Sequence, residues 1–200
     1  MAKNMQPIAK RCRALGISPA SMGYYKKDTE KRKPGGQMRK KKSEYATQLQ
    51  EKQKVKFVYG IMEKQFHSYY EKAARMPGKT GDNLLVLIER RLDNVIFRLG
   101  FAATRREARQ LVNHGHFTVN GRRVNIPSFQ VKPGMVIAPK ESSRNLEKIK
   151  ANVEANSFRQ APRWLEYDAA NMIAKVVAVP TREDIDMPIE EHLIVELYSK

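Results

Sequence analysis

Apolar residues recur at intervals of three and four along two long stretches of the chain, which predicts amphipathic helices. The first stretch starts at Ser43, has a joint at Gly60 and ends at Pro77-Gly78. The second ends at Gly100, and Asp82 is its expected N-cap. The periodic positions are Val55, Val58, Tyr59, Met62, Phe66, Tyr69, Tyr70 and Ala73, then Leu84, Leu85, Ile88, Leu92, Val95, Ile96 and Leu99. We expect the aromatic members to lie in the core.

A shorter helix and a hairpin are predicted between Thr104 and Val124. Thr104 and Glu107 have capping-box spacing, with the threonine accepting from the Glu107 amide and the glutamate from the Thr104 amide. Gly115 suits the left-handed residue after a helix, and Asn120-Gly121 favours a type I′ hairpin turn. That turn places Thr118 opposite Arg123 and Phe117 opposite Val124. Ala108, Leu111 and Val112 form the packing face of the helix.

The last third of the chain mixes strand and helix signals. A return strand is expected at 135–138, and a further hairpin joins Trp164–Tyr167 to Ile173–Val179. Ser143 is the expected cap of a helix between these strands. Pro188 suits the first turn of a C-terminal helix, although alternating apolar residues there leave a strand open. The fold class is therefore α+β, with a mainly antiparallel sheet of four or five strands.

The chain carries a formal charge of +17, which points to a polyanionic partner, nucleic acid above all. Residues 1–60 hold 16 basic and 4 acidic side chains, so the N-terminal part attracts polyanions most strongly. Residues 1–43 form a basic arm that we expect to be poorly ordered alone. No apolar run reaches the length of a membrane span, and the N-terminus lacks a signal-peptide core, so we expect a cytosolic protein.

Cys12 is the single cysteine, which excludes an intrachain disulfide and a cysteine-cluster zinc site. Two other motifs suggest chemistry and fail on context. Residues 73–80 fit a loose phosphate-loop pattern but follow a helical segment rather than a strand. His114 and His116 lack a nearby third metal ligand. We therefore expect no catalysis, no metal and no cofactor.

Arginines and polar residues follow one face of the Thr104 helix and continue into the hairpin. Arg105, Arg106 and Arg109 precede Arg122 and Arg123, and together they favour an RNA-binding patch over a merely solvated face. An RNA-modifying enzyme, a regulatory RNA-binding module and a duplex DNA binder stay open as alternatives.

Several motifs occur together and in order along almost the whole chain: Glu51-Lys52-Gln53-Lys54, Arg91-Leu92-Asp93, Thr104-Arg105, Val119-Asn120-Gly121 and the closing Glu191-His192-Leu193-Ile194-Val195-Glu196-Leu197-Tyr198. In these the chain resembles the family of bacterial small-subunit ribosomal protein number four. The Arg-Leu-Asp triplet also occurs around the catalytic aspartate of pseudouridine synthases, but too few residues follow here to build their catalytic domain. We expect Asp93 to be a structural charge.

The resemblance implies a discontinuous helical domain, 44–90 with 181–200, and an inserted domain, 91–180. The insert contains the RNA-binding module at about 91–140, with a helix-turn-helix-like motif on the sheet. The family implies primary binding of 16S ribosomal RNA early in assembly of the small subunit's body. It also implies small-subunit proteins five and twelve as partners in decoding accuracy, messenger RNA near the entry channel as a further contact, and a monomer within the ribonucleoprotein.

Two positions depart from the family pattern. Some members carry four zinc-binding cysteines in the arm, where this chain has Cys12 alone, so the arm must fold without zinc. Gly134-Met135 replaces a common Gly-Asp at a turn. The expected RNA-binding residues are Arg91, Arg98, Arg105, Arg106, Arg109, Gln110, Asn113, His114, His116, Asn120, Arg122, Arg123, Lys10, Arg11, Arg13, Lys33, Arg39, Lys40, Lys52 and Lys54.

Overall fold

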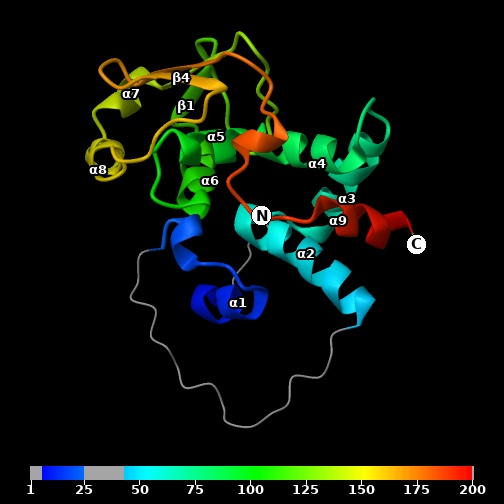
Figure 1. Ribbon diagram of the computed structural model, residues 1–200. Helices are drawn as coiled ribbons and strands as arrows, with labels where there is room; N and C mark the ends of the chain where they lie inside the picture. The colour runs from blue at the N-terminus through cyan, green and yellow to red at the C-terminus, as the bar shows by residue number, and fades with distance from the viewer. Residues whose placement is uncertain (1–5, 25–42, 200) are drawn as a thin grey trace. The chain divides into compact units, whose positions relative to one another are not determined.

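The computed structural model describes residues 6–24 and 43–199 and confirms the α+β class (Figure 1). The helical elements of these residues are α1 (Ile8–Leu15), η1 (Pro19–Met22), α2 (Glu44–Tyr59), α3 (Glu63–Ala74), α4 (Thr80–Glu89), α5 (Leu92–Arg98), α6 (Arg105–Asn113), α7 (Glu141–Arg144), α8 (Glu147–Ala155), η2 (Arg182–Asp184) and α9 (Glu191–Ser199). The strands are β1 (Phe117–Val119), β2 (Arg122–Arg123), β3 (Val136–Pro139), β4 (Leu165–Asp168) and β5 (Ile173–Val176).

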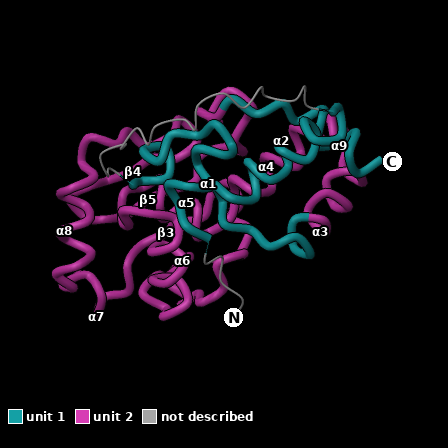
Figure 2. The backbone as a smooth tube through the Cα atoms, turned by 90° about the horizontal axis from the view of Figure 1, so that it is seen from below, with its two compact units in different colours: residues 1–66, 188–200 teal, residues 67–187 magenta. Residues whose placement is uncertain are grey.

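The chain divides into two compact units, which Figure 2 colours separately. Unit 1 holds residues 1–66 and 188–200, and unit 2 holds residues 67–187. The C-terminal segment therefore returns to the N-terminal part of the chain. The boundaries predicted from the sequence, at residues 43, 90 and 180, stay a prediction about domains.

Unit 1 is built on the packing of α2 against α9. Ser43 caps α2, because its hydroxyl oxygen accepts a hydrogen bond from the Ala46 amide at 3.3 Å. The helix ends at Gly60, whose φ of 64° is left-handed. Val55 and Ile194 are fully buried, which gives the unit its apolar centre. The C-terminal segment is thus a helix, and the alternative prediction of a strand from its alternating apolar residues is wrong.

The described part of the N-terminal arm is folded, which corrects the expectation of poor order for residues 8–22. Helix α1 contacts α2, and Cys12, Leu15 and Met22 are buried. The Cys12 thiol donates to the Met22 sulfur at 3.9 Å. Apolar burial therefore accounts for the order of this segment. Sequence reasoning missed it because charge dominates the composition of the arm.

Unit 2 contains a five-stranded antiparallel sheet in the order β2-β1-β3-β5-β4. The predicted strand number and the final hairpin, β4 with β5, are confirmed. Phe117, Ile137 and Ala174 point from the sheet into a core shared with α5 and α6. Phe101 meets Phe117 edge to face, with ring centroids 5.4 Å apart. The sheet thereby supports the two helices from one side.

The first hairpin forms as predicted. Asn120 and Gly121 have φ angles of 49° and 77°, the left-handed pair that a type I′ turn requires. Thr118 lies opposite Arg123, and the Val124 amide donates to the Phe117 carbonyl at 3.2 Å. The Asn120 side-chain oxygen accepts from the Val136 amide at 2.8 Å, which fastens the turn to β3.

The long helix expected from Leu84 to Leu99 is wrong, because the helix breaks between α4 and α5. Residues 127–131 cross the break and accept its backbone donors. The Leu92 amide donates to Phe129 O at 2.9 Å, and the Asp93 amide donates to Pro127 O at 3.2 Å. These acceptors satisfy amides at a helix start that otherwise lack partners. A contact distant in sequence therefore overrides the local periodicity.

Two expected caps also differ. Lys79 occupies the N-cap position of α4, so Asp82 lies in the first turn, where its charge still suits the helix dipole. Ser143 lies inside the short helix α7 rather than before a longer one, and Leu146 precedes α8. Ser143 is buried and makes a side-chain contact to His116, which explains its placement.

Candidate nucleic-acid interface

Helix α6 begins at a cap of the predicted type. The Thr104 hydroxyl oxygen accepts from the Glu107 amide at 3.2 Å. The return bond differs from expectation, because the Glu107 carboxylate accepts from the Ala103 amide at 2.9 Å rather than from Thr104. Burial raises the pKa of Glu107, but hydrogen bonds from Asn152 and Ala103 and the Lys148 charge outweigh burial, so the pKa lies below its ordinary value. Glu107 is therefore ionised at neutral pH and anchors the start of α6.

One face of α6 continues into the hairpin as an exposed polar surface. Arg106 and Gln110 are exposed on α6, and His114 follows at its end. On the hairpin, Arg122 and Arg123 are exposed too. We call these five residues the outer basic face. The neighbouring candidates Asn113 and His116 are half-buried, and Asn120 is exposed at the turn.

Arg123 joins the hairpin to the end of α6. Its Nη2 donates to the His114 carbonyl at 3.2 Å, at the negative end of the helix dipole. Gly115 has a left-handed φ of 73°, which favours glycine, and a Cβ there would lie 2.1 Å from Arg123 Nε, so the arginine side chain would have to move. This hydrogen bond therefore joins the helix and the hairpin of the outer basic face.

His116 contributes polarity rather than charge. Its Nδ1 lies 3.0 Å from the Ser143 hydroxyl, and its ring is 6.0 Å from that of His114. Burial lowers the pKa of His116, and the nearby His114 and Arg123 charges lower it further. The ring is therefore neutral at pH 7.

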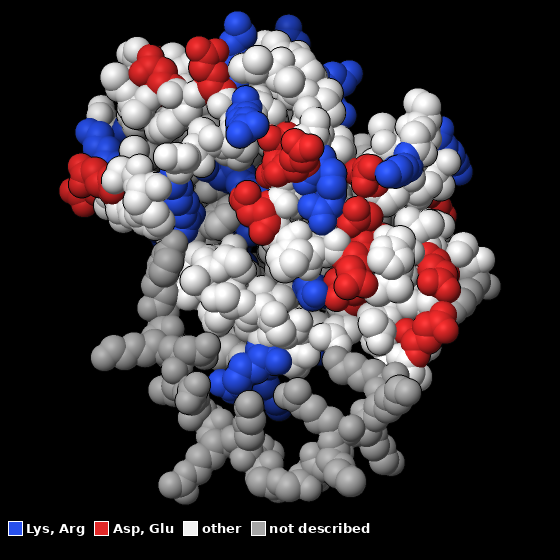
Figure 3. Space-filling view, viewed as in Figure 1, with Lys and Arg blue, Asp and Glu red and all other residues white. Residues whose placement is uncertain are grey.

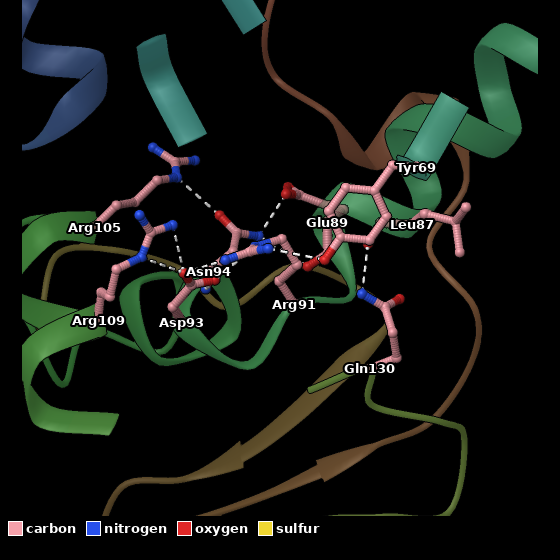
Figure 4. Close-up of polar contacts among 9 residues, drawn as sticks. All are labelled: Tyr69, Leu87, Glu89, Arg91, Asp93, Asn94, Arg105, Arg109 and Gln130. Atoms are coloured by element: carbon pink, nitrogen blue, oxygen red, sulfur yellow. Dashed lines mark hydrogen bonds and ion pairs between the residues drawn. The ribbon is translucent and has the colours of Figure 1, made fainter. Parts of the chain in front are cut away.

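Four other candidate arginines lie against internal acceptors, and Figure 4 shows three of them. Asp93 is 3% exposed and is the centre of the group. Its carboxylate accepts from Arg91 Nε at 3.0 Å and Nη2 at 2.7 Å. It also accepts from Arg109 Nε at 2.9 Å and Nη2 at 2.8 Å (Figure 4). Arg91 pairs bidentately with the two carboxylate oxygens, whereas both Arg109 donors meet Oδ2 alone, and charge on both partners strengthens these hydrogen bonds.

Arg91 extends the group to the middle of α3. Its Nη1 donates to the Tyr69 hydroxyl oxygen at 2.8 Å, and its side chain is 2% exposed. Burial lowers the pKa of Arg91, but Asp93 and Tyr69 outweigh burial and the net direction is upward. Arg91 therefore stays charged inside the protein.

Asn94 and Glu89 hold the remaining two arginines. Arg105 Nε donates to Asn94 Oδ1 at 2.8 Å, and its guanidinium lies 4.3 Å from the centre of the Phe97 ring. Arg98 Nε donates to the fully buried Glu89 carboxylate at 2.9 Å. Asn94 Nδ2 donates to the Glu89 carbonyl at 2.9 Å. We call Glu89, Arg91, Asp93, Asn94, Arg98, Arg105 and Arg109 the inner arginine cluster.

The sequence indicated Asp93 as a structural charge, which its placement fits, but it did not indicate Glu89 or Asn94. The available signal was an acid and an amide within an otherwise apolar stripe, where a polar residue needs a buried partner.

Two candidates of unit 1 are also paired with acidic side chains. Lys52 lies 3.0 Å from Glu63, and Lys54 pairs with Glu51. Lys10 and Arg13 are exposed on α1, and Arg11 is half-buried. Lys33, Arg39 and Lys40 lie outside the described residues.

The described residues contain no group of three or more His, Cys, Asp and Glu side chains that can hold a metal. Residues 73–80 join the end of α3 to the start of α4, as expected of an ordinary loop, and Asn83 Nδ2 donates to the Pro77 carbonyl at 3.0 Å. Within the same described ranges, no helix is both long and apolar enough to cross a membrane. On the face in Figure 3, acidic side chains lie among basic ones, so this face is not uniformly basic.

Two family models together match residues 3–137. Residues 3–89 match the ribosomal protein S4/S9 N-terminal domain, and residues 90–137 match the S4 domain. The outer basic face lies within the S4-domain match.

Relatives named small ribosomal subunit protein uS4 are similar over the full length. The proteins of Agathobacter rectalis and Pelotomaculum thermopropionicum are each 54% identical, with 100% of both chains covered. The protein of Clostridioides difficile is 63% identical over 82% of this chain and 79% of its own. The chain therefore belongs to the uS4 family of ribosomal proteins, which are structural, non-enzymatic components of the small ribosomal subunit.

Proposed function

We propose that this protein binds 16S ribosomal RNA directly through the outer basic face and nucleates assembly of the small subunit's body. The observation that carries the proposal is the continuous exposed polar surface of α6 and the hairpin, which Arg123 joins at the His114 carbonyl. A fixed arrangement of exposed cations and amides fits one spatial arrangement of RNA phosphates better than others. The α5–α6 pair would be the helix-turn-helix-like part of this element.

Binding on this proposal is driven by electrostatics and selected by shape. Arginine side chains displace counterions condensed on the phosphates, which gives affinity without sequence preference. The rigid surface adds selectivity, because it meets all its phosphates only on one folded RNA arrangement. By linkage, a protein that prefers the folded RNA stabilises that fold, and later proteins then find their sites formed.

We further propose that the protein contacts small-subunit proteins five and twelve and thereby influences decoding accuracy. Residues 181–200 support a protein-facing role, because they hold six acidic residues against Arg182 and Lys200. Such a segment repels phosphate and suits a basic protein. Messenger RNA near the entry channel is a further proposed contact of the basic arm, and the protein acts as one copy in a cytoplasmic ribonucleoprotein.

Nucleotide-resolution footprinting on 16S ribosomal RNA, with and without the full chain, tests the central proposal. We expect a compact protected region and tighter binding than to noncognate RNA or duplex DNA of equal length. In sucrose gradients the protein should be present once in every small subunit. Equal affinity for all three polyanions would contradict the proposal, and sub-stoichiometric occupancy would favour a regulatory module.

A further inference from the structure

Arg106 and Arg109 lie three residues apart on α6 and have opposite surroundings. Arg106 is exposed, whereas the Arg109 side chain is 25% exposed and lies against Asp93. Both Nε and Nη2 of Arg109 donate to that carboxylate. A phosphate that recruited these two donors would have to displace a buried anion. The two arginines therefore cannot serve RNA in the same way.

Asp93 receives hydrogen bonds from several directions at once. Oδ1 accepts from Arg91 Nε and from the Asn94 amide, each at 3.0 Å. Oδ2 accepts from Arg91 and Arg109. Because Arg91 also donates to Tyr69, this one carboxylate links the middle of α3, the start of α5 and the middle of α6 (Figure 4).

A second tie holds the same side of α6. Arg105 donates to Asn94 and stacks on Phe97, one helical turn before Arg109. Positions 105 and 109 fall on one face of α6, and positions 106 and 110 fall on the neighbouring face. Fixing the first pair against α5 therefore fixes where the second pair points.

We propose that Asp93 is a positioning residue for RNA binding, which sets the rotation of α6 by holding Arg109. Arg109 then acts on RNA only through Asp93, while Arg106 meets phosphate directly. The inference rests on the proposed function, because it needs an RNA that the outer basic face distinguishes from others. It assigns selectivity to a buried carboxylate and affinity to exposed cations.

The test compares Arg109→Ala and Asp93→Asn with Arg106→Ala, each in the full chain. Dissociation constants are measured for 16S ribosomal RNA and for a noncognate RNA of equal length over a range of KCl concentrations. For Arg106→Ala we expect the salt slope on noncognate RNA to fall by about 0.9, with little change in the preference for 16S RNA. For Arg109→Ala and Asp93→Asn we expect an unchanged noncognate slope and a preference reduced by about tenfold.

Coupling and charge are controlled separately. The double variant Arg109→Ala/Asp93→Asn should lose no more preference than either single variant, because both act on one link. Glu166→Gln on β4 removes the same charge as Asp93→Asn at an exposed site, and it should leave the preference unchanged.

Misfolding alone would weaken binding to both RNAs in proportion and leave the preference intact, so the preference separates positioning from stability. If Asp93→Asn does not fold, Arg109→Ala alone decides, because Arg91 still pairs with Asp93 in it. A noncognate slope that falls as far for Arg109→Ala as for Arg106→Ala would overturn the proposal. A wild-type chain without preference for 16S RNA would instead contradict the proposed function.

Discussion

The inner arginine cluster and the outer basic face each include side chains of α6, and they differ in what accepts their hydrogen bonds. The inner arginine cluster meets Asp93, Glu89 and Asn94, all at most 3% exposed. The outer basic face is exposed, and Arg123 donates to a backbone carbonyl at a helix end. In the sequence, the arginines of the two sets look alike. The acceptor, rather than the arginine, separates a side chain that holds the fold from one available to a partner.

Removing a buried cation should give the largest difference in stability between the two sets. We expect Arg91→Met to lower the free energy of unfolding by about 3–5 kcal/mol, because Asp93 then loses one buried partner. Arg122→Met on the outer basic face should change it by at most about 0.5 kcal/mol. Urea unfolding followed by circular dichroism measures both. Similar losses for the two variants would show that burial does not distinguish the sets.

The outer basic face should show its effect in binding instead. The double variant Arg106→Ala/Arg122→Ala should reduce the salt slope of RNA binding by about 1.8, which is about thirtyfold in affinity near 0.15 M salt. Its unfolding free energy should stay within about 1 kcal/mol of wild type. Filter binding at several salt concentrations gives the slope. An unchanged slope would mean that these arginines are only solvated.

The hairpin that carries part of the outer basic face depends on Asn120. Asn120→Ala should cost about 1–2 kcal/mol, because alanine tolerates a φ of 49° poorly and the Val136 amide loses its side-chain acceptor. Asn120→Gly should cost less, because glycine adopts that angle freely. Thermal unfolding compares the two. Equal losses would assign the whole effect to the hydrogen bond.

Unit 1 offers a milder case of basic residues held by an acid. Burial raises the pKa of Glu63, but hydrogen bonds from Lys56, Lys52 and Tyr198 lower it to about 2. Its stabilisation is complete above the ordinary value of 4.5 and is lost as pH falls toward 2. Because Glu63 is half-exposed, we expect Glu63→Gln to cost at most about 1 kcal/mol at neutral pH. Acid unfolding should be less steep in the variant below pH 4.5, and an unchanged profile would contradict the assignment.

Local features were predictable from the sequence. The Thr104 cap, the Asn120-Gly121 turn and the Thr118–Arg123 register depend on residues within a few positions of one another. The break between α4 and α5 was not predictable, because the acceptors of the Leu92 and Asp93 amides come from Phe129 and Pro127. Long-range hydrogen bonds leave no trace in periodicity.

The candidate site was predictable as a region but not in its parts. Residue type and spacing identified α6 and the hairpin as basic, yet Arg109 meets a carboxylate 16 residues away whereas Arg106 is exposed. Whether a buried acid faces a given arginine depends on how α5 packs on α6. That packing follows from the core around Val95, Ala108 and Leu111, which periodicity describes only as apolar.

The crossing of residues 127–131 over the start of α5 has a consequence for the order of events during synthesis. The amides of Leu92 and Asp93 have no carbonyl partner until Pro127 and Phe129 have emerged from the ribosome that makes the chain. A nascent chain that ends at residue 120 already contains α6 but cannot complete the start of α5. We expect its α5 amides to exchange with solvent faster than those of a chain extended past residue 131, as hydrogen exchange on arrested chains would measure. The nascent protein would thus complete the start of α5 only late in its synthesis.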